Sequence, residues 1–124
     1  MDQNVLVVDS HPEIRKLMVE ILKKRGYQVS TVSDGHDALT RFALDRPDLV
    51  ITGLSMPGLN GYQLCRLIRG ISSVPVLLMS ALPGAEEKAY RSGANGFVSK
   101  PFDLEYLWDE IEELLLETRS PSAG

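Results

Sequence analysis

The sequence has little of what several functional classes need. It contains one cysteine, Cys65, and two histidines, so it predicts neither an internal disulfide nor a zinc site. No apolar run approaches the roughly 20 residues of a membrane-spanning helix, and we expect no membrane partner. The N-terminal residues show neither the basic region nor the small-residue cleavage site of a signal peptide. Together these absences predict a cytoplasmic protein.

Positive charge is also scarce. Lys and Arg number 13 against 17 Asp and Glu, for a net charge of −4, and acidic residues crowd between positions 103 and 117. Proteins that bind nucleic acid neutralise its phosphates with a basic face. We therefore expect no nucleic-acid binding by this domain.

The 124 residues are enough for one compact domain with its own core. Apolar, β-branched runs alternate five times with stretches of helical period, which is typical of a parallel sheet with crossover helices. The predicted strands are residues 5–8, 27–32, 49–52, 76–79 and 96–99. The second run alternates apolar and polar residues and is predicted to be an edge strand.

Five helices are predicted between and after these strands. Ser33 or Asp34 can cap the second, which directs Ala43 inward, and the fifth begins after Asp103 and buries Leu104 and Trp108. The fourth has a thin apolar stripe and is expected to be the most mobile. The helices span residues 12–25, 34–46, 60–69, 84–92 and 103–118. The domain is predicted to cover residues 1–118, and residues 119–124 resemble a tail or the start of a linker.

The carboxyl ends of parallel strands meet in one crevice, where α/β proteins place their chemistry. Here the third strand ends at Gly53, followed by a turn, where a reactive side chain would be presented. The other strand ends carry Asp9 and Ser10, Ser80, and Lys100 with Pro101.

Six short motifs give the chain a family resemblance. They are residues 5–9 (VLVVD), 47–51 (PDLVI), 56–58 with 60–61 (MPG, NG), 79–81 (MSA), 93–97 (GANGF) and 99–102 (SKPF). In this order and spacing, they make residues 4–118 resemble a receiver domain of bacterial two-component response regulators. The resemblance implies a flavodoxin-like three-layer (βα)5 sandwich with strand order 2-1-3-4-5.

In that family an aspartate at the position of Gly53 accepts a phosphoryl group, with Mg²⁺ and an ammonium group to hold the phosphoryl oxygens. The resemblance places the metal ligands at Asp9, Ser10, residue 53 and the Ser55 carbonyl. Only Asp9 keeps a carboxylate. Together with Lys100, the family pocket would sum to a net charge of −2, whereas this pocket sums to zero. We expect no cofactor, no enzyme activity, and Mg²⁺ binding that is weak at best, through Asp9.

Three further positions match the family. Ser80 and Lys100 match its phosphate-contacting residues, although Lys100 can instead pair with Asp9, and Ser80 can bond a backbone group. Phe97 matches an aromatic switch residue and, without a polar tip, is predicted to be buried. The resemblance also predicts a cis peptide bond before Pro101.

The leading hypothesis is a degenerate receiver that acts through phosphorylation-independent protein contacts. The resemblance implies a contact face of the fourth helix, fifth strand and fifth helix, with a histidine kinase or a fused output domain as candidate partners. One alternative is an ordinary phosphoacceptor receiver inactivated at Gly53. Another is a small-molecule-binding flavodoxin-like module. Neither His11 nor His36 is expected to serve as a catalytic base.

Overall fold

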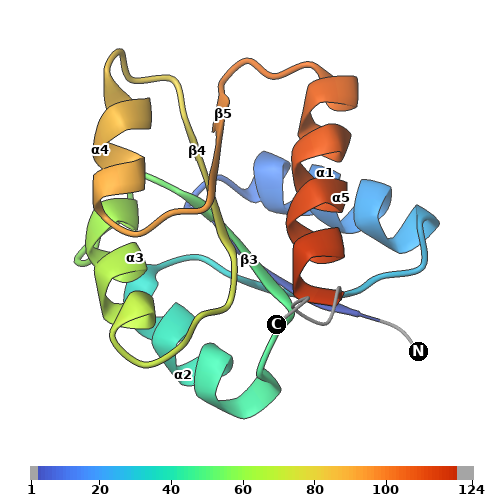
Figure 1. Ribbon diagram of the computed structural model, residues 1–124, viewed down its shortest axis with the longest axis horizontal. Coiled ribbons are helices and arrows are strands. Elements are labelled where there is room, and N and C mark those ends of the chain that lie inside the picture. The colour runs from blue at the N-terminus through green and yellow to red at the C-terminus, as the bar shows by residue number, and fades with distance from the viewer. Residues whose placement is uncertain (1–2, 120–124) are drawn as a thin grey trace.

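The computed structural model describes residues 3–119, which form an open sheet of five parallel strands covered by helices on both faces (Figure 1). The strand order is β2-β1-β3-β4-β5, which confirms the predicted flavodoxin-like order. The strands are β1 (Asn4–Val8), β2 (Gln28–Val32), β3 (Leu49–Gly53), β4 (Val76–Ser80) and β5 (Gly96–Ser99).

Five helices follow the strands in alternation: α1 (Pro12–Lys24), α2 (Gly35–Asp45), α3 (Gly61–Arg69), α4 (Ala85–Arg91) and α5 (Leu104–Arg119). Helices α1 and α5 lie on one face of the sheet, and α2, α3 and α4 lie on the other (Figure 1). Each face has its own cluster of buried residues. The central strands β1, β3 and β4 contribute to both clusters because their successive side chains point to opposite faces. This burial on both faces explains why these strands are apolar without alternation.

Local sequence signals set most helix starts. The Asp34 side chain accepts a hydrogen bond from the backbone N–H of Asp37, and Asn60 forms a capping box with Gln63 at the start of α3. Helix α4 differs, because it has seven residues and begins after Gly84, which supplies no side-chain cap. Its expected mobility remains a prediction.

Two residues predicted to point inward are exposed. Leu104 is 46% exposed, although it is three residues from buried Leu107, because the first turn of α5 lies beyond the buried cluster on that face. Ala43 on α2 is also exposed, while Phe42 beside it takes the buried position. Trp108 is a packing residue, as predicted: its ring stacks on Tyr27 at 6.5 Å between centroids.

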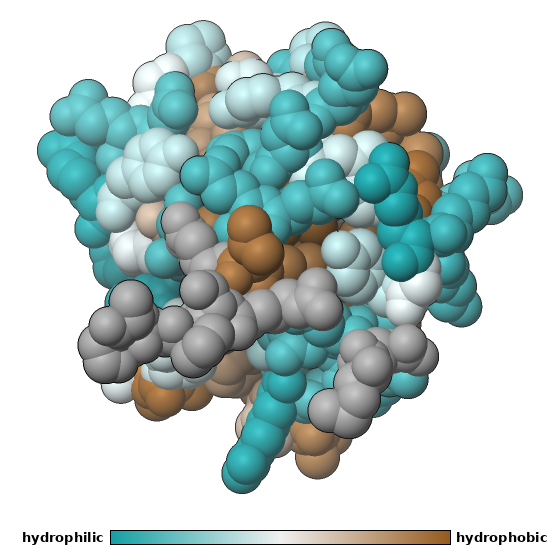
Figure 2. Space-filling model, turned by 45° about the vertical axis from the view of Figure 1, so that its right-hand side comes forward, coloured by the Kyte–Doolittle hydropathy of each residue, from teal (hydrophilic) through white to brown (hydrophobic). Residues whose placement is uncertain are grey.

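Hydrophilic side chains cover most of the face seen in Figure 2, and hydrophobic ones form separate patches between them. Within residues 3–119, none of the helices combines the length and the apolar character needed to cross a bilayer. Helix α5 continues to Arg119, one residue beyond the predicted domain end, and the rest of the predicted tail, residues 120–124, lies outside the described residues.

Candidate functional site

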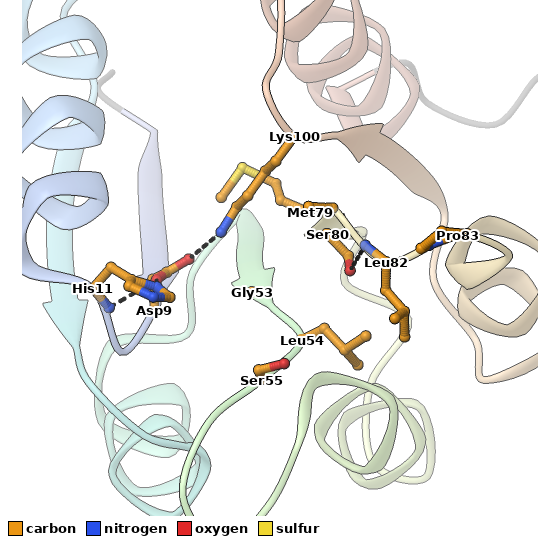
Figure 3. A pocket seen from close by; sticks show the side chains of 11 residues that line it. Asp9, His11, Gly53, Leu54, Ser55, Met79, Ser80, Leu82, Pro83 and Lys100 are labelled. Atoms are coloured by element: carbon orange, nitrogen blue, oxygen red, sulfur yellow. Dashed lines mark hydrogen bonds and ion pairs between the residues drawn. The ribbon is translucent and has the colours of Figure 1, made fainter.

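A pocket of about 380 Å³ opens at the carboxyl end of the sheet, between the loops that follow β1, β3, β4 and β5 (Figure 3). The strand ends named in the sequence meet here because all five strands are parallel. The pocket is lined by Asp9, His11, Gly53, Leu54, Ser55, Met79, Ser80, Ala81, Leu82, Pro83 and Lys100.

Gly53 is the last residue of β3 and is buried. A β-carbon built on it would lie 2.6 Å from Oδ2 and 3.2 Å from Cγ of Asp9. Real β-carbons essentially never approach a neighbour to 2.6 Å, so a side chain at position 53 would require the Asp9 carboxylate to shift. The sequence alone did not predict this close approach.

Asp9 is 1% exposed, and its charge is fully partnered. The ammonium group of Lys100 lies 3.1 Å from Oδ2, and the two side chains point toward each other across the end of β3 (Figure 3). On the other oxygen, Oδ1 accepts a hydrogen bond of 2.9 Å from the His11 backbone N–H and lies 3.0 Å from the imidazole Nδ1. A carboxylate this deeply buried is stable only with such partners. Of the two roles considered from the sequence, phosphate contact and pairing with Asp9, Lys100 takes the second in this structure.

Ser10 and Ser55 also meet. The Ser10 hydroxyl donates a hydrogen bond of 3.1 Å to the Ser55 carbonyl, which is the backbone oxygen that the family resemblance assigns to the metal. By the family resemblance, a carboxylate at position 10 would bind the metal together with this oxygen. The Ser10 hydroxyl instead forms a hydrogen bond to it.

Ser80 bonds to backbone rather than facing the pocket with a free hydroxyl. Its Oγ accepts a hydrogen bond of 3.0 Å from the Leu82 N–H, and its carbonyl accepts one of 2.9 Å from the Lys100 N–H. The second bond joins the ends of β4 and β5 and helps fix the backbone from which Lys100 reaches Asp9.

Phe97 lies on β5 with 4% of its surface exposed, within the cluster that α2, α3 and α4 cover. The Tyr106 hydroxyl of α5 lies 3.4 Å from the Phe97 carbonyl. The Lys100-Pro101 peptide bond is cis.

The residues of the pocket do not fit a Mg²⁺ site. Mg²⁺ is held by carboxylate and other hard oxygen ligands, and the one carboxylate here, Asp9, is already bound to Lys100 and His11. Residues 3–119 contain no group of three or more Asp, Glu, His and Cys side chains that could hold a metal ion. Nor is the single thiol a nucleophile: burial raises the pKa of Cys65 to about 12, an effect that Arg69 partly offsets.

Sequence reasoning missed two residues that shape the crevice. The His11 side chain is 61% exposed, and the residue anchors Asp9 through both its backbone N–H and its ring. The sequence signal for such a turn is an aspartate two residues before the N-cap residue of a helix. Gly61 opens α3, and a β-carbon there would overlap the Gly53 carbonyl oxygen. The glycine at position 61 therefore lets α3 approach the end of β3 closely.

The comparisons with known proteins agree with the fold. The family model described as "Response regulator receiver domain" matches residues 5–112. A receiver domain of a signal transduction histidine kinase from Syntrophus aciditrophicus has a TM-score of 0.89 at 30% identity, covering 98% of this chain and 96% of that one. A putative response regulator from Chloroflexus aurantiacus has a TM-score of 0.89 at 26% identity, covering 94% and 99% of the two chains.

Curated relatives extend beyond this chain. A probable transcriptional regulator, ycf27, from Cyanophora paradoxa is 36% identical over 97% of this chain and 51% of its own length. The DNA-binding response regulator MtrA from Mycolicibacterium smegmatis is 36% identical over 82% of this chain and 46% of its own length. The chain thus spans about half the length of these relatives.

These relatives correct the prediction about partners. No nucleic-acid binding was expected, on the ground of the acidic composition, and that expectation is wrong, because relatives of this chain are named DNA-binding response regulators. The error has a physical cause: the net charge of one domain carries no information about the surface of the other half of a longer protein.

Proposed function

The chain belongs to the response regulator receiver domain family, whose members act in signalling, and on that premise we propose that it is an atypical receiver. It signals through contacts with other protein domains and needs no phosphoryl group on an aspartate. Its crevice holds one fixed arrangement of side chains in place of the phosphorylation chemistry.

One observation carries the proposal: the Asp9 carboxylate fills the space beside Gly53. The position that a β-carbon at residue 53 would take lies 2.6 Å from a carboxylate oxygen, and the same oxygen is paired with the ammonium group of Lys100. Both groups that would hold a phosphoryl group and its metal are thus engaged with each other.

The charges in the pocket lining support the same proposal. Phosphoryl transfer needs cations around the three charged oxygens, and Lys100 is the one ammonium group in the pocket lining. Its charge is balanced by Asp9. Mg²⁺ binding is proposed to be weak or absent, because Ser10 and Gly53 supply no carboxylate.

We further propose that the receiver, residues 1–118, regulates a DNA-binding output domain, with residues 119–124 beginning the linker to it. Support comes from the relatives named as DNA-binding regulators, about half of whose length this chain spans. Contact with DNA would then belong to the output domain, and the receiver would set its availability.

The proposal is tested by incubating the chain with acetyl phosphate and Mg²⁺ and measuring its intact mass. We expect no phosphoryl adduct, because neither a nucleophile nor a metal site is available. A stoichiometric adduct on the unaltered chain would show that the proposal is wrong.

Two variants test which of positions 10 and 53 prevents phosphorylation. In Gly53→Asp alone, the new side chain must displace Asp9 and has no carboxylate at position 10 to help hold Mg²⁺, so we expect no adduct. Adding Ser10→Asp restores the acidic pair and should give Mg²⁺-dependent phosphorylation. Mg²⁺-dependent phosphorylation of the single variant would instead support an ordinary receiver inactivated at one position. Circular dichroism of each variant serves as the folding control.

A further inference from the structure

A second pocket adjoins the crevice. It has a volume of about 500 Å³ and shares Leu54, Ser55 and Leu82 with the first pocket. We call the two together the joined groove. It runs between the β3–α3 and β4–α4 loops, from Lys100 in the crevice to Lys88 on α4. The second pocket is lined by Leu54, Ser55, Met56, Pro57, Asn60, Tyr62, Leu82 and Lys88.

The walls of the joined groove are mainly apolar. Leu54, Tyr62 and Met79 are fixed in the core, with 7%, 6% and 0% of their surfaces exposed. Leu82, by contrast, is 58% exposed at the rim, where its side chain projects beside Leu54 (Figure 3). Pockets of about 300–1,000 Å³ that combine apolar walls with a few polar groups are the usual form of small-molecule sites. A ligand lying over Leu54 and Leu82 would cover an apolar side chain that is now in water.

The charge of the joined groove is opposite to that of the chain. Its lining contains one carboxylate, Asp9, and two ammonium groups, Lys100 and Lys88. Asp9 and Lys100 neutralise each other. The remaining cation, Lys88, lies 4.8 Å from the centre of the Tyr62 ring. Among the described side chains, no carboxylate forms an ion pair with it.

The positive charge of Lys88 is distinctive because of where it lies. The whole chain carries a net charge of −4, whereas the lining of the joined groove has an excess of one positive charge. A cation held against an aromatic ring at the edge of an apolar groove attracts an anion and leaves apolar surface beside it.

We propose that the joined groove binds a small organic anion with an apolar body. The anionic group lies at Lys88, and the apolar body lies over Leu54 and Leu82. This ligand would act as the input that replaces phosphorylation, and in that respect the inference rests on the proposed function. Acidic side chains at positions 10 and 53 would repel such an anion, and neither position carries one in this chain.

The test uses two fluorescent probes of similar shape, the anion anilinonaphthalenesulfonate and the neutral N-phenylnaphthylamine. Both should bind the folded chain. Lys88→Gln should weaken binding of the anionic probe by about threefold to fivefold, the range expected for one solvent-accessible ionic contact. The same substitution should leave binding of the neutral probe unchanged. Lys24→Gln, on the exposed end of α1, is the matched control and should affect neither probe.

The apolar wall is tested separately. Leu82→Ser should weaken both probes by about tenfold, because it removes a large apolar contact. Leu44→Ser, which changes a 72% exposed leucine on α2, should weaken neither. All four positions are exposed, and an unchanged thermal midpoint confirms that each variant is folded. Equal binding of the anionic probe to the unaltered chain and to Lys88→Gln, or equal effects of the two leucine substitutions, would overturn the inference.

The outcome is separable from the test of the proposed function. Probe binding in a chain that also accepts a phosphoryl group would refute the proposed function but leave the binding site standing. Failure of both probes to bind, with no phosphoryl adduct, would remove the binding site and leave the atypical receiver standing.

Discussion

The two ends of the sheet are held together by different kinds of contact. At the amino ends of β4 and β5, the Arg69 guanidinium donates hydrogen bonds to the Gly93 carbonyl at 3.1 and 2.9 Å and to the Ser72 carbonyl at 3.0 Å. It also bonds the Asn95 Oδ1 at 2.7 Å, an oxygen that accepts the Val76 N–H at 2.9 Å. At the carboxyl ends, the central contact is an ion pair between two side chains, Lys100 and Asp9.

The two ends differ in how far their contacts depend on the identity of the side chains. Arg69 binds mostly backbone carbonyls, which remain whatever side chains their residues carry. The ion pair in the crevice joins two side chains, so a change at either position leaves the other without its partner. With glycine at position 53 and serine at position 10, Asp9 turns beside Gly53 and Ser10 bonds the Ser55 carbonyl. The crevice has this arrangement within the fold that the chain shares with its structural neighbours.

The comparison is tested most strongly by Arg69→Ala. The substitution leaves part-buried carbonyls at Gly93 and Ser72 without their donor, and unsatisfied buried groups cost more than a lost hydrogen bond alone. We expect the free energy of unfolding to fall by about 2–4 kcal/mol, measured by urea denaturation. Arg66→Ala, on the exposed face of the same helix, should change it by less than about 0.5 kcal/mol. Similar values for the two variants would mean that the amino end does not depend on this network.

Much of the fold follows from the sequence, but the arrangement of the crevice does not. The apolar runs, Pro12, Asp34 and Asn60 predict the elements and their order because periodicity and capping are local properties. The sequence also shows directly that Gly53 ends a strand and that Ser10 lacks a carboxylate. The direction of the Asp9 side chain is not, because it depends on space left by a residue 44 positions away.

The same limit applies to the edges of the core. Leu104 has the helical spacing of a buried residue but lies in a turn beyond the buried cluster. The joined groove could not be predicted either, because Leu54, in the β3–α3 loop, and Lys88, on α4, line one pocket only through the tertiary fold. Periodicity indicates which face of a helix is apolar, whereas neighbouring elements decide how much of that face is covered.

At the carboxyl end, Lys100→Met should have the next largest effect. The Asp9 carboxylate is 2% exposed, and removing its ammonium partner leaves a buried charge with only the His11 contacts. Breaking such pairs is strongly destabilising, but the Lys100 side chain is 21% exposed, so water reduces the penalty. We expect a loss of about 2 kcal/mol in urea denaturation, against no change for Lys24→Met on the surface. A stable variant would show that Lys100 contributes little to the crevice.

Gly53→Ala tests the packing between Asp9 and β3. Its β-carbon would approach Oδ2 of Asp9 to 2.6 Å, so the carboxylate must shift from its place between Gly53 and Lys100, at a cost of about 1–2 kcal/mol. Gly70→Ala is the matched control, since a β-carbon there meets its nearest neighbour at an ordinary 3.5 Å. In an Asp9→Ala background, the cost of Gly53→Ala should disappear, because the two sites are in contact. Strict additivity in this double-mutant cycle would contradict the proposed contact.

The smallest effect is expected for Ser10→Ala. Its hydroxyl donates one exposed hydrogen bond to the Ser55 carbonyl, and water can replace that donor, so the free energy of unfolding should fall by less than about 0.5 kcal/mol. This expectation separates the two meanings that position 10 can have. If the Ser10 hydroxyl stabilises the fold, Ser10→Ala will lower the free energy of unfolding as much as Gly53→Ala does. If residue 10 matters only because it lacks a carboxylate, Ser10→Ala will hardly change the free energy of unfolding. Only Ser10→Asp will then have an effect, on Mg²⁺ binding and phosphoryl transfer.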